Sequence, residues 1–371
     1  THQYPDIRLV YWAGGNPFHH HQDLNRLRRA WQNIETVIVH EPFWTSLARH
    51  ADIVLPATVP LERNDVSASK RDRFIVASRQ AAEPYDDSQN DHDIFASLAR
   101  RLTPGGGLNV DFEEAFTEGR GEAAWLETLY AQTRMNSAQL GHALPDYATF
   151  QRDGYVEIAP PDIARVALRD FRDAPTDNPL PTPSGRIEIF SENIASFGIE
   201  NLPGHPTWVE PTEWLGATAM TKNWPLHLVS HQPSRRLHSQ LDHGAHSRAG
   251  KIADREPCRI HPDDAAGRDI HDGDAVEIFN GRGACLSIAQ LDEGVRRGVV
   301  MLATGAWLDP DFDADPKRCK HGNANILTAD LPTSAFSQGP GALTCLVDIR
   351  RWTGPLPDQT AFVPPVIEDG R

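Results

Sequence analysis

The sequence predicts an α/β part with an open parallel sheet, followed by a part built as a β-barrel. In residues 7–55, short apolar segments alternate with segments of helical periodicity, which is the order of an open parallel sheet. Beyond residue 226, short apolar segments are separated by Asp-Gly and Asn-Gly turns, which favours a barrel over a second parallel sheet. The chain is therefore predicted to belong to the α/β plus β class.

Hydrophobic spacing predicts the elements of the first part. Leu24, Leu27 and Trp31 recur at helical spacing, whereas Ile53, Val54 and Leu55 form a continuous apolar run that Pro56 ends. The predicted strands are residues 7–12, 36–39 and 52–55, and the predicted helices are residues 22–32, 45–49 and 91–102.

Turn residues predict the elements of the second part. Asn280-Gly281 is a strong two-residue hairpin signal, and residues 272–274 form another turn. The predicted strands are residues 187–190, 226–229, 275–279, 284–289 and 299–302. The predicted division is an α/β domain at 1–100, a mixed α/β segment and connector at 101–225, a barrel domain at 226–350, and a tail at 351–371.

Composition excludes several classes of function. The chain has 371 residues and a net charge of −15, whereas nucleic-acid binders usually carry a basic surface. No apolar run approaches the roughly 20 residues that a membrane span needs. The four Cys form no Cys-x-x-Cys pair, so we expect no iron–sulfur cluster or zinc knuckle within these residues.

The start of the sequence bears on its cellular location. Residues 1–5 contain no initiator Met, and no basic or apolar leader follows, so we expect a piece of a longer polypeptide. Any export signal would then precede these residues. Cytoplasm and periplasm both stay open, with the cytoplasm slightly favoured.

Residues 14–23 connect the first predicted strand to the first helix. Gly15 permits close approach of the backbone to a ligand, and the amide groups at a helix start favour a phosphate. The run lacks the Gly-x-Gly-x-x-Gly fingerprint, so an ordinary polar loop is an equal alternative. A metal site at His19, His20 and His21 is disfavoured, because three consecutive side chains cannot all point inward.

His40 and Glu41 follow the second predicted strand, where ligands of open α/β sheets bind. A carboxylate at this place commonly accepts hydrogen bonds from ribose hydroxyl groups. The alternative for Glu41 is a solvated acid of a loop.

A family resemblance rests on residues 14–18, 48–58 and 61–65 taken together. They resemble the third domain of the bis-molybdopterin S-oxide and N-oxide reductases of the dimethyl sulfoxide reductase family, which binds one of two guanine dinucleotide cofactors. The candidate cofactor-binding residues of this part are Gly15, Asn16, His20, Gln22, His40, Glu41, Arg63 and Asp93.

The resemblance gives these residues separate roles. His20 and Gln22 lie near the pterin, Glu41 at the nucleotide sugar and Arg63 near the nucleotide. Asp93 reads the guanine edge, which offers adjacent N–H donors to a carboxylate. The alternatives are a salt bridge of Arg63 with Glu62 or Asp65, and a helix N-cap for Asp93.

The second part resembles the last domain of the same family, a double-psi barrel. The matching runs are residues 230–240, 256–266, 272–274, 280–283, 305–310, 321–328 and 333–339. Gln232, His238, Asn325 and Gln338 are the implied cofactor contacts, since amide and imidazole groups suit the alternating donors and acceptors of a pterin. The alternative for His238 alone is a hydrogen-bonded core histidine.

The resemblance implies an enzyme that uses molybdenum bis(molybdopterin guanine dinucleotide). The expected reaction is oxygen-atom transfer from an S-oxide or N-oxide, with electrons from a donor protein or a reduced carrier. Gln232 and Leu308 make the chain most similar to the biotin sulfoxide reductases. The family's metal ligand lies in an N-terminal region that these residues do not match, so no catalytic or metal residue is assigned. A non-catalytic molybdopterin- or nucleotide-binding module, and a reductase or dehydrogenase of the nitrate or formate type, stay as alternatives.

Overall fold

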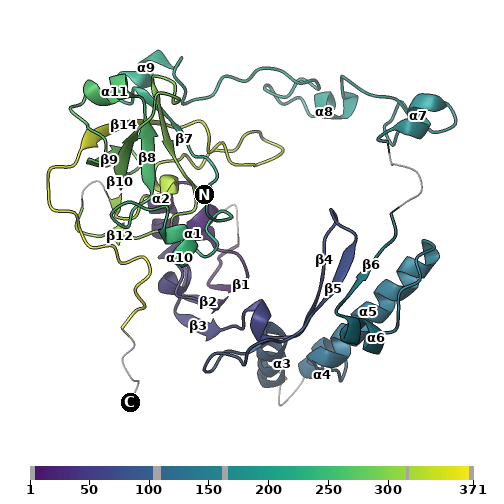
Figure 1. Cartoon of the computed structure of the whole chain (residues 1–371). Helices are drawn as coiled ribbons and strands as arrows, with labels where there is room; N and C mark the ends of the chain where they lie inside the picture. Colours follow the sequence, from purple (N-terminus) through teal and green to yellow (C-terminus); the bar gives the residue numbers. More distant parts are fainter. Residues whose placement is uncertain (1–4, 103–109, 161–165, 315–316, 367–371) are drawn as a thin grey trace. The chain divides into compact units, whose positions relative to one another are not determined.

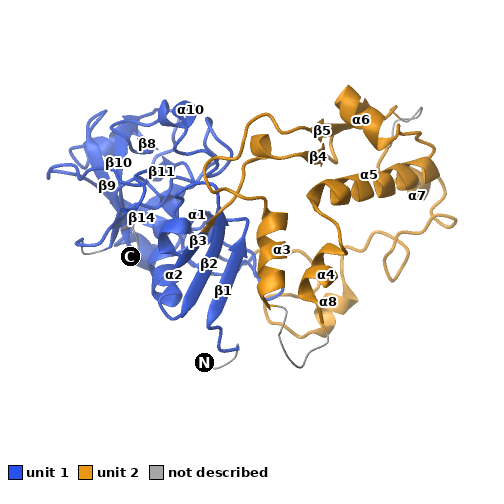
Figure 2. Cartoon of the chain, turned by 90° about the horizontal axis from the view of Figure 1, so that it is seen from below, with its two compact units in different colours: residues 1–54, 209–371 blue, residues 55–208 orange. Residues whose placement is uncertain are grey.

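The computed structural model describes residues 5–102, 110–160, 166–314 and 317–366. The chain divides into two compact units (Figure 2). The first unit joins residues 1–54 to residues 209–371, and the second comprises residues 55–208. The predicted domain boundaries differ from this division and stay predictions.

The start of the chain forms the predicted α/β element. Its three strands stand in the order β1-β2-β3, and β1 pairs in parallel with β2 from Leu9 opposite Thr36 to Ala13 opposite His40 (Figure 1). The elements are β1 (Leu9–Ala13), α1 (Pro17–His20), α2 (Leu24–Trp31), β2 (Thr36–Glu41), η1 (Ala48–His50) and β3 (Ile53–Pro56). The predicted order of strands and helices is confirmed, with α1 as an additional short helix.

Residues 226–351 contain a closed ring of six strands, which confirms the predicted barrel. The ring runs β10-β8-β11-β7-β14-β9, and β9 pairs again with β10 to close it. Its strands are β7 (Leu226–Val229), β8 (Pro257–Ile260), β9 (Ala275–Phe279), β10 (Ala284–Leu291), β11 (Val299–Leu302) and β14 (Leu346–Arg351). The short strands β12 (Pro310–Asp311) and β13 (Arg318–Cys319) extend it at β10. Three short helices accompany the barrel, namely α9 (Thr218–Thr221), α10 (Ala245–Arg248) and α11 (Pro262–Ala266), together with η3 (Ala324–Ile326).

The Asn280-Gly281 turn joins β9 to β10 as predicted. The two strands pair antiparallel, with Phe279 opposite Ala284. The buried side-chain amide of Asn280 donates hydrogen bonds to the carbonyl oxygens of Leu327 and Leu346, at 2.9 and 3.0 Å. The turn residue therefore also binds the segment at Leu327 and the start of strand β14.

All four cysteines lie in the barrel core. They are free thiols with no exposed surface, and burial raises the pKa of Cys258 and of Cys345 to about 12. Because the thiolate is the reactive form, we expect no labelling of the native protein by a thiol reagent near neutral pH. Denaturation should expose four thiols, as an absorbance assay would measure. Rapid labelling of any thiol in the folded protein would contradict this burial.

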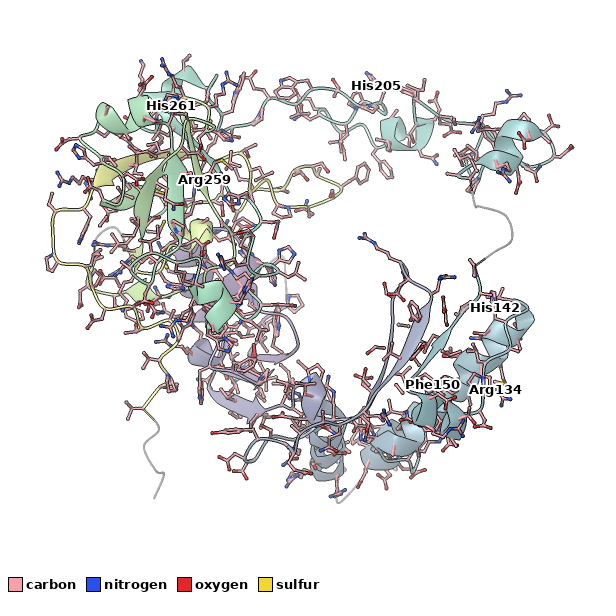
Figure 3. All side chains as sticks on the ribbon, in the orientation of Figure 1. Arg134, His142, Phe150, His205, Arg259 and His261 are labelled. Carbon is pink, nitrogen blue, oxygen red and sulfur yellow. The ribbon has the colours of Figure 1, made fainter. Side chains whose placement is uncertain are left out.

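The second unit has a small sheet of its own. Its strands β4 (Asp65–Ala68), β5 (Phe74–Ser78) and β6 (Tyr155–Glu157) pair antiparallel in that order. Its helices are α3 (Asp91–Leu102), α4 (Phe112–Thr117), α5 (Glu122–Gln139), α6 (Tyr147–Asp153), α7 (Arg169–Asp173) and α8 (Glu192–Ser196), with η2 (Pro60–Glu62). Phe150 is fully buried and stacks on Tyr130 at 4.2 Å between α5 and α6 (Figure 3).

The predicted strand at residues 187–190 is wrong, because these residues form loop and bends. The alternating apolar pattern requires one covered face, but Ile187 and Ile189 are 66% and 82% exposed. Among the described residues, no helix is both long and apolar enough to span a membrane.

Candidate functional site

The loop after β1 is attached to residue Thr45 by a buried hydrogen bond. Gly14 and Gly15 have φ angles of 92° and 80°, in the region that favours glycine. Asn16 is buried, and its amide donates a hydrogen bond to Oγ1 of Thr45 at 3.0 Å. The Oδ1 atom of Asn16 is buried and has no hydrogen-bond partner among the described residues, so an acceptor is available at this loop.

His40 and Glu41 lie beside this loop, because β1 and β2 are parallel and end at the same edge of the sheet. Nε2 of His40 lies 2.6 Å from the hydroxyl of Tyr11. Oγ1 of Thr45 donates to Glu41 at 3.0 Å. Burial raises the pKa of Glu41 to about 7, although hydrogen bonds from Thr45 and Asn16 act in the opposite direction. A proton acceptor or donor is therefore available here near neutral pH.

The raised pKa of Glu41 predicts a pH dependence of stability. The folded state binds more protons than the unfolded state between pH 4.5 and about 7. The contribution of Glu41 to the free energy of unfolding should therefore fall by on the order of 3 kcal/mol as pH rises through this window, and stay level above it. Burial lowers the pKa of His19 to about 3 and that of His50 to about 4, and these groups act in the opposite direction, so the contribution of Glu41 is read from the difference between the wild type and Glu41→Gln. Urea denaturation at several pH values should show this difference falling across the window. Glu35→Gln, at an exposed carboxylate, is the control and should follow the wild-type profile. An unchanged profile in Glu41→Gln would contradict the prediction.

Three of the predicted site residues line one cavity of about 280 Å³. His20 ends α1, Gln22 lies in the loop between α1 and α2, and Gln338 comes from the segment before β14. Gln22 is buried, whereas His20 and Gln338 are exposed. Burial, and then the charge of His21, lower the pKa of His20. Segments more than 300 residues apart in the sequence thus present neutral polar groups to one cavity.

Hydrogen bonds join the segment at residues 19–23 to the segment at residues 325–328. The amide of Asn325 donates to the carbonyl oxygen of His19 at 3.2 Å, and the backbone N–H of Asp23 donates to the carbonyl oxygen of Thr328 at 3.0 Å. Asn325, one of the predicted contacts, therefore already has one structural partner. Its role toward a cofactor stays a prediction.

Gln232 lines a second and larger cavity of about 560 Å³. This cavity is formed by the loop at residues 231–236 and by side chains of the barrel, including Arg259 and Gln290 (Figure 3 labels Arg259). His238 does not line this cavity. It is exposed, so the alternative of a core histidine is wrong, and its carbonyl oxygen accepts a hydrogen bond from Arg236 at 3.0 Å.

Arg63 and Asp93 lie in the second unit. Arg63 donates to the carbonyl oxygen of Thr58 at 2.7 Å, and its Nε lies 3.9 Å from Asp65, so the alternative salt bridge is present at long distance. Asp93 lies in the first turn of α3, which begins at Asp91, so the N-cap alternative is wrong. Their contacts with a nucleotide stay predictions.

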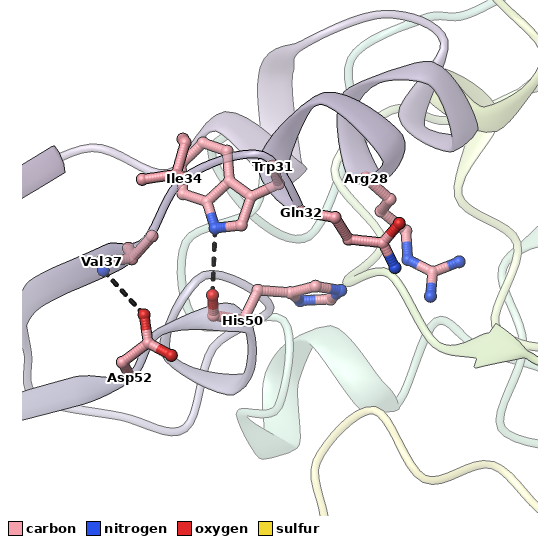
Figure 4. A pocket seen from close by; sticks show the side chains of 7 residues that line it. All are labelled: Arg28, Trp31, Gln32, Ile34, Val37, His50 and Asp52. Carbon is pink, nitrogen blue, oxygen red and sulfur yellow. Dashed lines mark hydrogen bonds between the residues drawn. The ribbon is translucent and has the colours of Figure 1, made fainter. Parts of the chain in front are cut away.

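Another cavity, of about 230 Å³, lies at the opposite edge of the first sheet. It is lined by Arg28, Trp31, Gln32, Ile34, Val37, His50 and Asp52 (Figure 4). Two groups on its wall are already bonded: Nε1 of Trp31 donates to the carbonyl oxygen of His50, and the N–H of Val37 donates to Asp52. Val37 is the second residue of β2 whereas Glu41 ends the strand, so this cavity is separate from the predicted site.

Sequence reasoning missed Thr45 and the aromatic neighbours of His19. Thr45 links Asn16 to Glu41, and His19 packs on Trp307 of the barrel. The only sequence signal was that three consecutive histidines cannot share one direction, and the structure buries His19 while His20 is exposed. Among the described residues, no group of three His, Cys, Asp or Glu side chains could hold a metal ion.

Two family models match the chain. "Molybdopterin oxidoreductase" matches residues 2–101, and "Molydopterin dinucleotide binding domain" matches residues 226–346. These two segments contain the candidate residues at the sheet edge and those of the barrel.

Curated relatives match nearly all of the chain. It is 46% identical to a biotin sulfoxide reductase of Cereibacter sphaeroides, over 95% of this chain and 46% of the relative. It is 41% identical to a dimethyl sulfoxide/trimethylamine N-oxide reductase of Rhodobacter capsulatus, over 98% of this chain and 43% of the relative. It is 42% identical to a trimethylamine-N-oxide reductase of Haemophilus influenzae, over 98% of this chain and 44% of the relative. The chain therefore spans about half the length of the relatives it matches.

A solved structure shares the fold. Acetylene hydratase from Pelobacter acetylenicus aligns with a TM-score of 0.70 at 17% identity, over 95% of this chain and 45% of that one. At this identity the similarity concerns the fold alone.

Proposed function

Because this chain belongs to the molybdopterin oxidoreductase family, we propose that it is the cofactor-binding part of a reductase of S-oxides or N-oxides. The observation that carries the proposal is the cavity at which His20 and Gln22 meet Gln338. The relatives include a biotin sulfoxide reductase and reductases of dimethyl sulfoxide and trimethylamine N-oxide, and biotin sulfoxide is the first substrate to test.

The described residues fit molybdenum bis(molybdopterin guanine dinucleotide). The buried Oδ1 of Asn16 has no partner and can accept a hydrogen bond from a ligand. Gly14 and Gly15 leave the backbone accessible at a strand-to-helix junction, where a phosphate is favoured. Amide groups of Gln22, Gln232 and Gln338 supply both donors and acceptors to a pterin rim.

We assign the nucleotide sugar to Glu41. Its carboxyl group lies at the end of a parallel strand, as in other dinucleotide-binding sheets. Hydrogen bonds from Thr45 and Asn16 orient the carboxyl group, which is proposed to accept a further hydrogen bond from a ribose hydroxyl. Arg63 and Asp93 are proposed to contact the nucleotide and its guanine. We also infer that the six-stranded ring is a double-psi barrel, since two of its strand pairs are parallel.

The residues of this chain bind and orient the cofactor. When bound, the cofactor supplies the two-electron redox chemistry of oxygen-atom transfer. His20, Gln22 and Gln338 offer neutral polar groups to a pterin at the 280 Å³ cavity, and the carboxylate of Asp330 on the same wall is paired with Arg26 at 3.0 Å. The metal ligand and the residues that contact substrate are proposed to lie outside this chain. Electrons are proposed to come from a donor protein or a reduced carrier.

The test begins with protein isolated from its natural source. Intact mass, molybdenum content and guanine nucleotide released by acid are measured together, followed by reduction of biotin sulfoxide, dimethyl sulfoxide and trimethylamine N-oxide. The proposal predicts a polypeptide well above 41.2 kDa with bound molybdenum and guanine, and reduction of at least one oxide. A 41.2 kDa protein that contains neither molybdenum nor guanine would contradict it and would favour a non-catalytic binding module.

A further inference from the structure

His19 is buried between the two halves of the first unit. The residue is 7% exposed, and its ring stacks on the indole of Trp307, with centroids 5.5 Å apart and planes inclined by 18°. Burial lowers the pKa of His19 to about 3, so the ring is neutral at physiological pH. Its Nε2 atom is buried without a hydrogen-bond partner. Among the described residues, the contact that the ring makes is its stack on Trp307.

Trp307 is fixed from the barrel side. Its backbone N–H donates to Asp242 at 3.0 Å, and its indole N–H donates to the carbonyl oxygen of Ser239 at 2.8 Å. The rings of His243 and Phe362 pack on it at 5.1 and 5.5 Å. With hydrogen bonds at both ends and rings around it, the indole offers His19 a rigid surface.

The stack is directly connected to the predicted cofactor site. His19 precedes His20 in α1, and the carbonyl oxygen of His19 accepts the amide of Asn325. The ring and the carbonyl group of one residue are thus both attached to the barrel segment. Fixing these two groups restricts the backbone from which His20 and Gln22 reach the 280 Å³ cavity.

We propose that His19 is a positioning residue, whose ring stacked on Trp307 fixes the backbone that presents His20 and Gln22 to the cofactor. This inference rests on the proposed function, because it assigns the cavity to the pterin. His19 itself does not touch the cofactor in this proposal. A flat apolar ring at position 19 should therefore preserve this positioning role, whereas a side chain of similar bulk without a flat face should not preserve it.

The test compares His19→Phe with His19→Leu in the protein purified with its cofactor. Hydrogen exchange of the amides at residues 19–23 is measured along with retained molybdenum and guanine. In His19→Leu we expect exchange to rise, and cofactor retention to fall, by roughly tenfold, as when supporting residues around a ligand are lost. His19→Phe should keep wild-type values. In the double variant with Trp307→Leu and His19→Leu, hydrogen exchange and cofactor loss should be little greater than in either single variant, because both substitutions remove the same stack.

Phe150→Leu is the matched control, because it removes a ring from a buried stack in the second unit. It should leave hydrogen exchange at residues 19–23 unchanged.

Wild-type hydrogen exchange and wild-type cofactor retention in His19→Leu would overturn the inference. So would equal loss of cofactor from folded His19→Phe and His19→Leu, since it would show that the imidazole nitrogen contacts the cofactor. If His19→Leu fails to fold, Trp307→Phe and Trp307→Leu provide the same comparison from the other ring. If the wild-type protein holds no molybdenum or guanine, the proposed function fails, while hydrogen exchange still decides whether His19 positions the loop.

Discussion

Replacing Asp242 by Ala is expected to lower the free energy of unfolding by about 3–5 kcal/mol, the usual cost of removing one partner of a buried ion pair. Asp242 is fully buried, and its carboxylate lies 2.8 Å from Nζ of Lys251 and 3.3 Å from Nε of Arg236. Both cations are almost inaccessible to solvent, and they would keep only Glu256 as a charged partner. The backbone N–H of Trp307 would lose its acceptor as well.

Urea denaturation of the wild-type protein and of Asp242→Ala measures this loss. Glu35→Ala is the control, because Glu35 pairs with Arg8 on the surface at 2.6 Å with its own side chain 57% exposed. Such a pair should change stability by less than about 0.5 kcal/mol. Equal stability of the two variants would contradict the assignment of Asp242 as the centre of a buried charge network.

The same network predicts resistance to mild acid. Burial alone would raise the pKa of Asp242, but the hydrogen bond from His321 and the charges of Lys251 and Arg236 outweigh it and hold the pKa below its usual range. The folded state thus binds fewer protons than the unfolded state around and below the ordinary Asp value of about 3.9. The contribution of Asp242 to stability is therefore present above that pH and is lost as pH falls below it.

Gly305→Ala is expected to destabilise the protein by about 3 kcal/mol or more, through a clash between two backbone segments and an unfavourable φ angle. Gly305 is buried with a φ of 86°. An added Cβ would lie well inside van der Waals distance of the carbonyl oxygen of His238, and 2.8 Å from the amide nitrogen of Ser239. Because the opposing atoms belong to the backbone, no change of rotamer can relieve the clash.

Gly273→Ala separates the two causes. Gly273 has a similar φ of 83°, but nothing lies within 4 Å of its added Cβ. This control should lose only the conformational cost, roughly 1–2 kcal/mol. Denaturation curves give the difference between the variants, and molybdenum content reports whether displacement of His238 weakens cofactor binding. Equal stability of Gly305→Ala and Gly273→Ala would show that the segment of Gly305 and the segment of His238 and Ser239 can move apart without loss of stability.

Local signals in the sequence predicted most of the fold correctly. The Asn280-Gly281 turn and the apolar runs around it act over a few residues, so spacing alone identifies β9 and β10. Residues 187–190 have the alternating apolar pattern of a strand. They form no strand, because this pattern cannot reveal whether another segment covers its apolar face. The compact units were not predicted, since the packing of residues 1–54 with residues 209–371 depends on contacts between distant segments.

The candidate site was predictable to a similar extent. The order of motifs selected His20, Gln22 and Gln338, and the structure brings these three to one cavity. Thr45 and Trp307 were not selected, because each acts through another side chain and no motif marks such a role. Arg63 and Asp93 follow from the resemblance alone.

The first unit is built from two segments that lie far apart in the sequence, and this affects its folding during synthesis. Residues 1–54 pack with the barrel, and the barrel is complete only when its last strand, β14, has been made. Because β14 ends at Arg351, it is synthesised almost 300 residues after residues 1–54. At ordinary rates of translation this interval lasts roughly 15–60 s. During that time Phe18, Leu24 and Val39 lack the barrel side of their common core. Residues 1–54 of the nascent chain should therefore be a substrate for chaperones that hold exposed apolar segments until β14 has been synthesised.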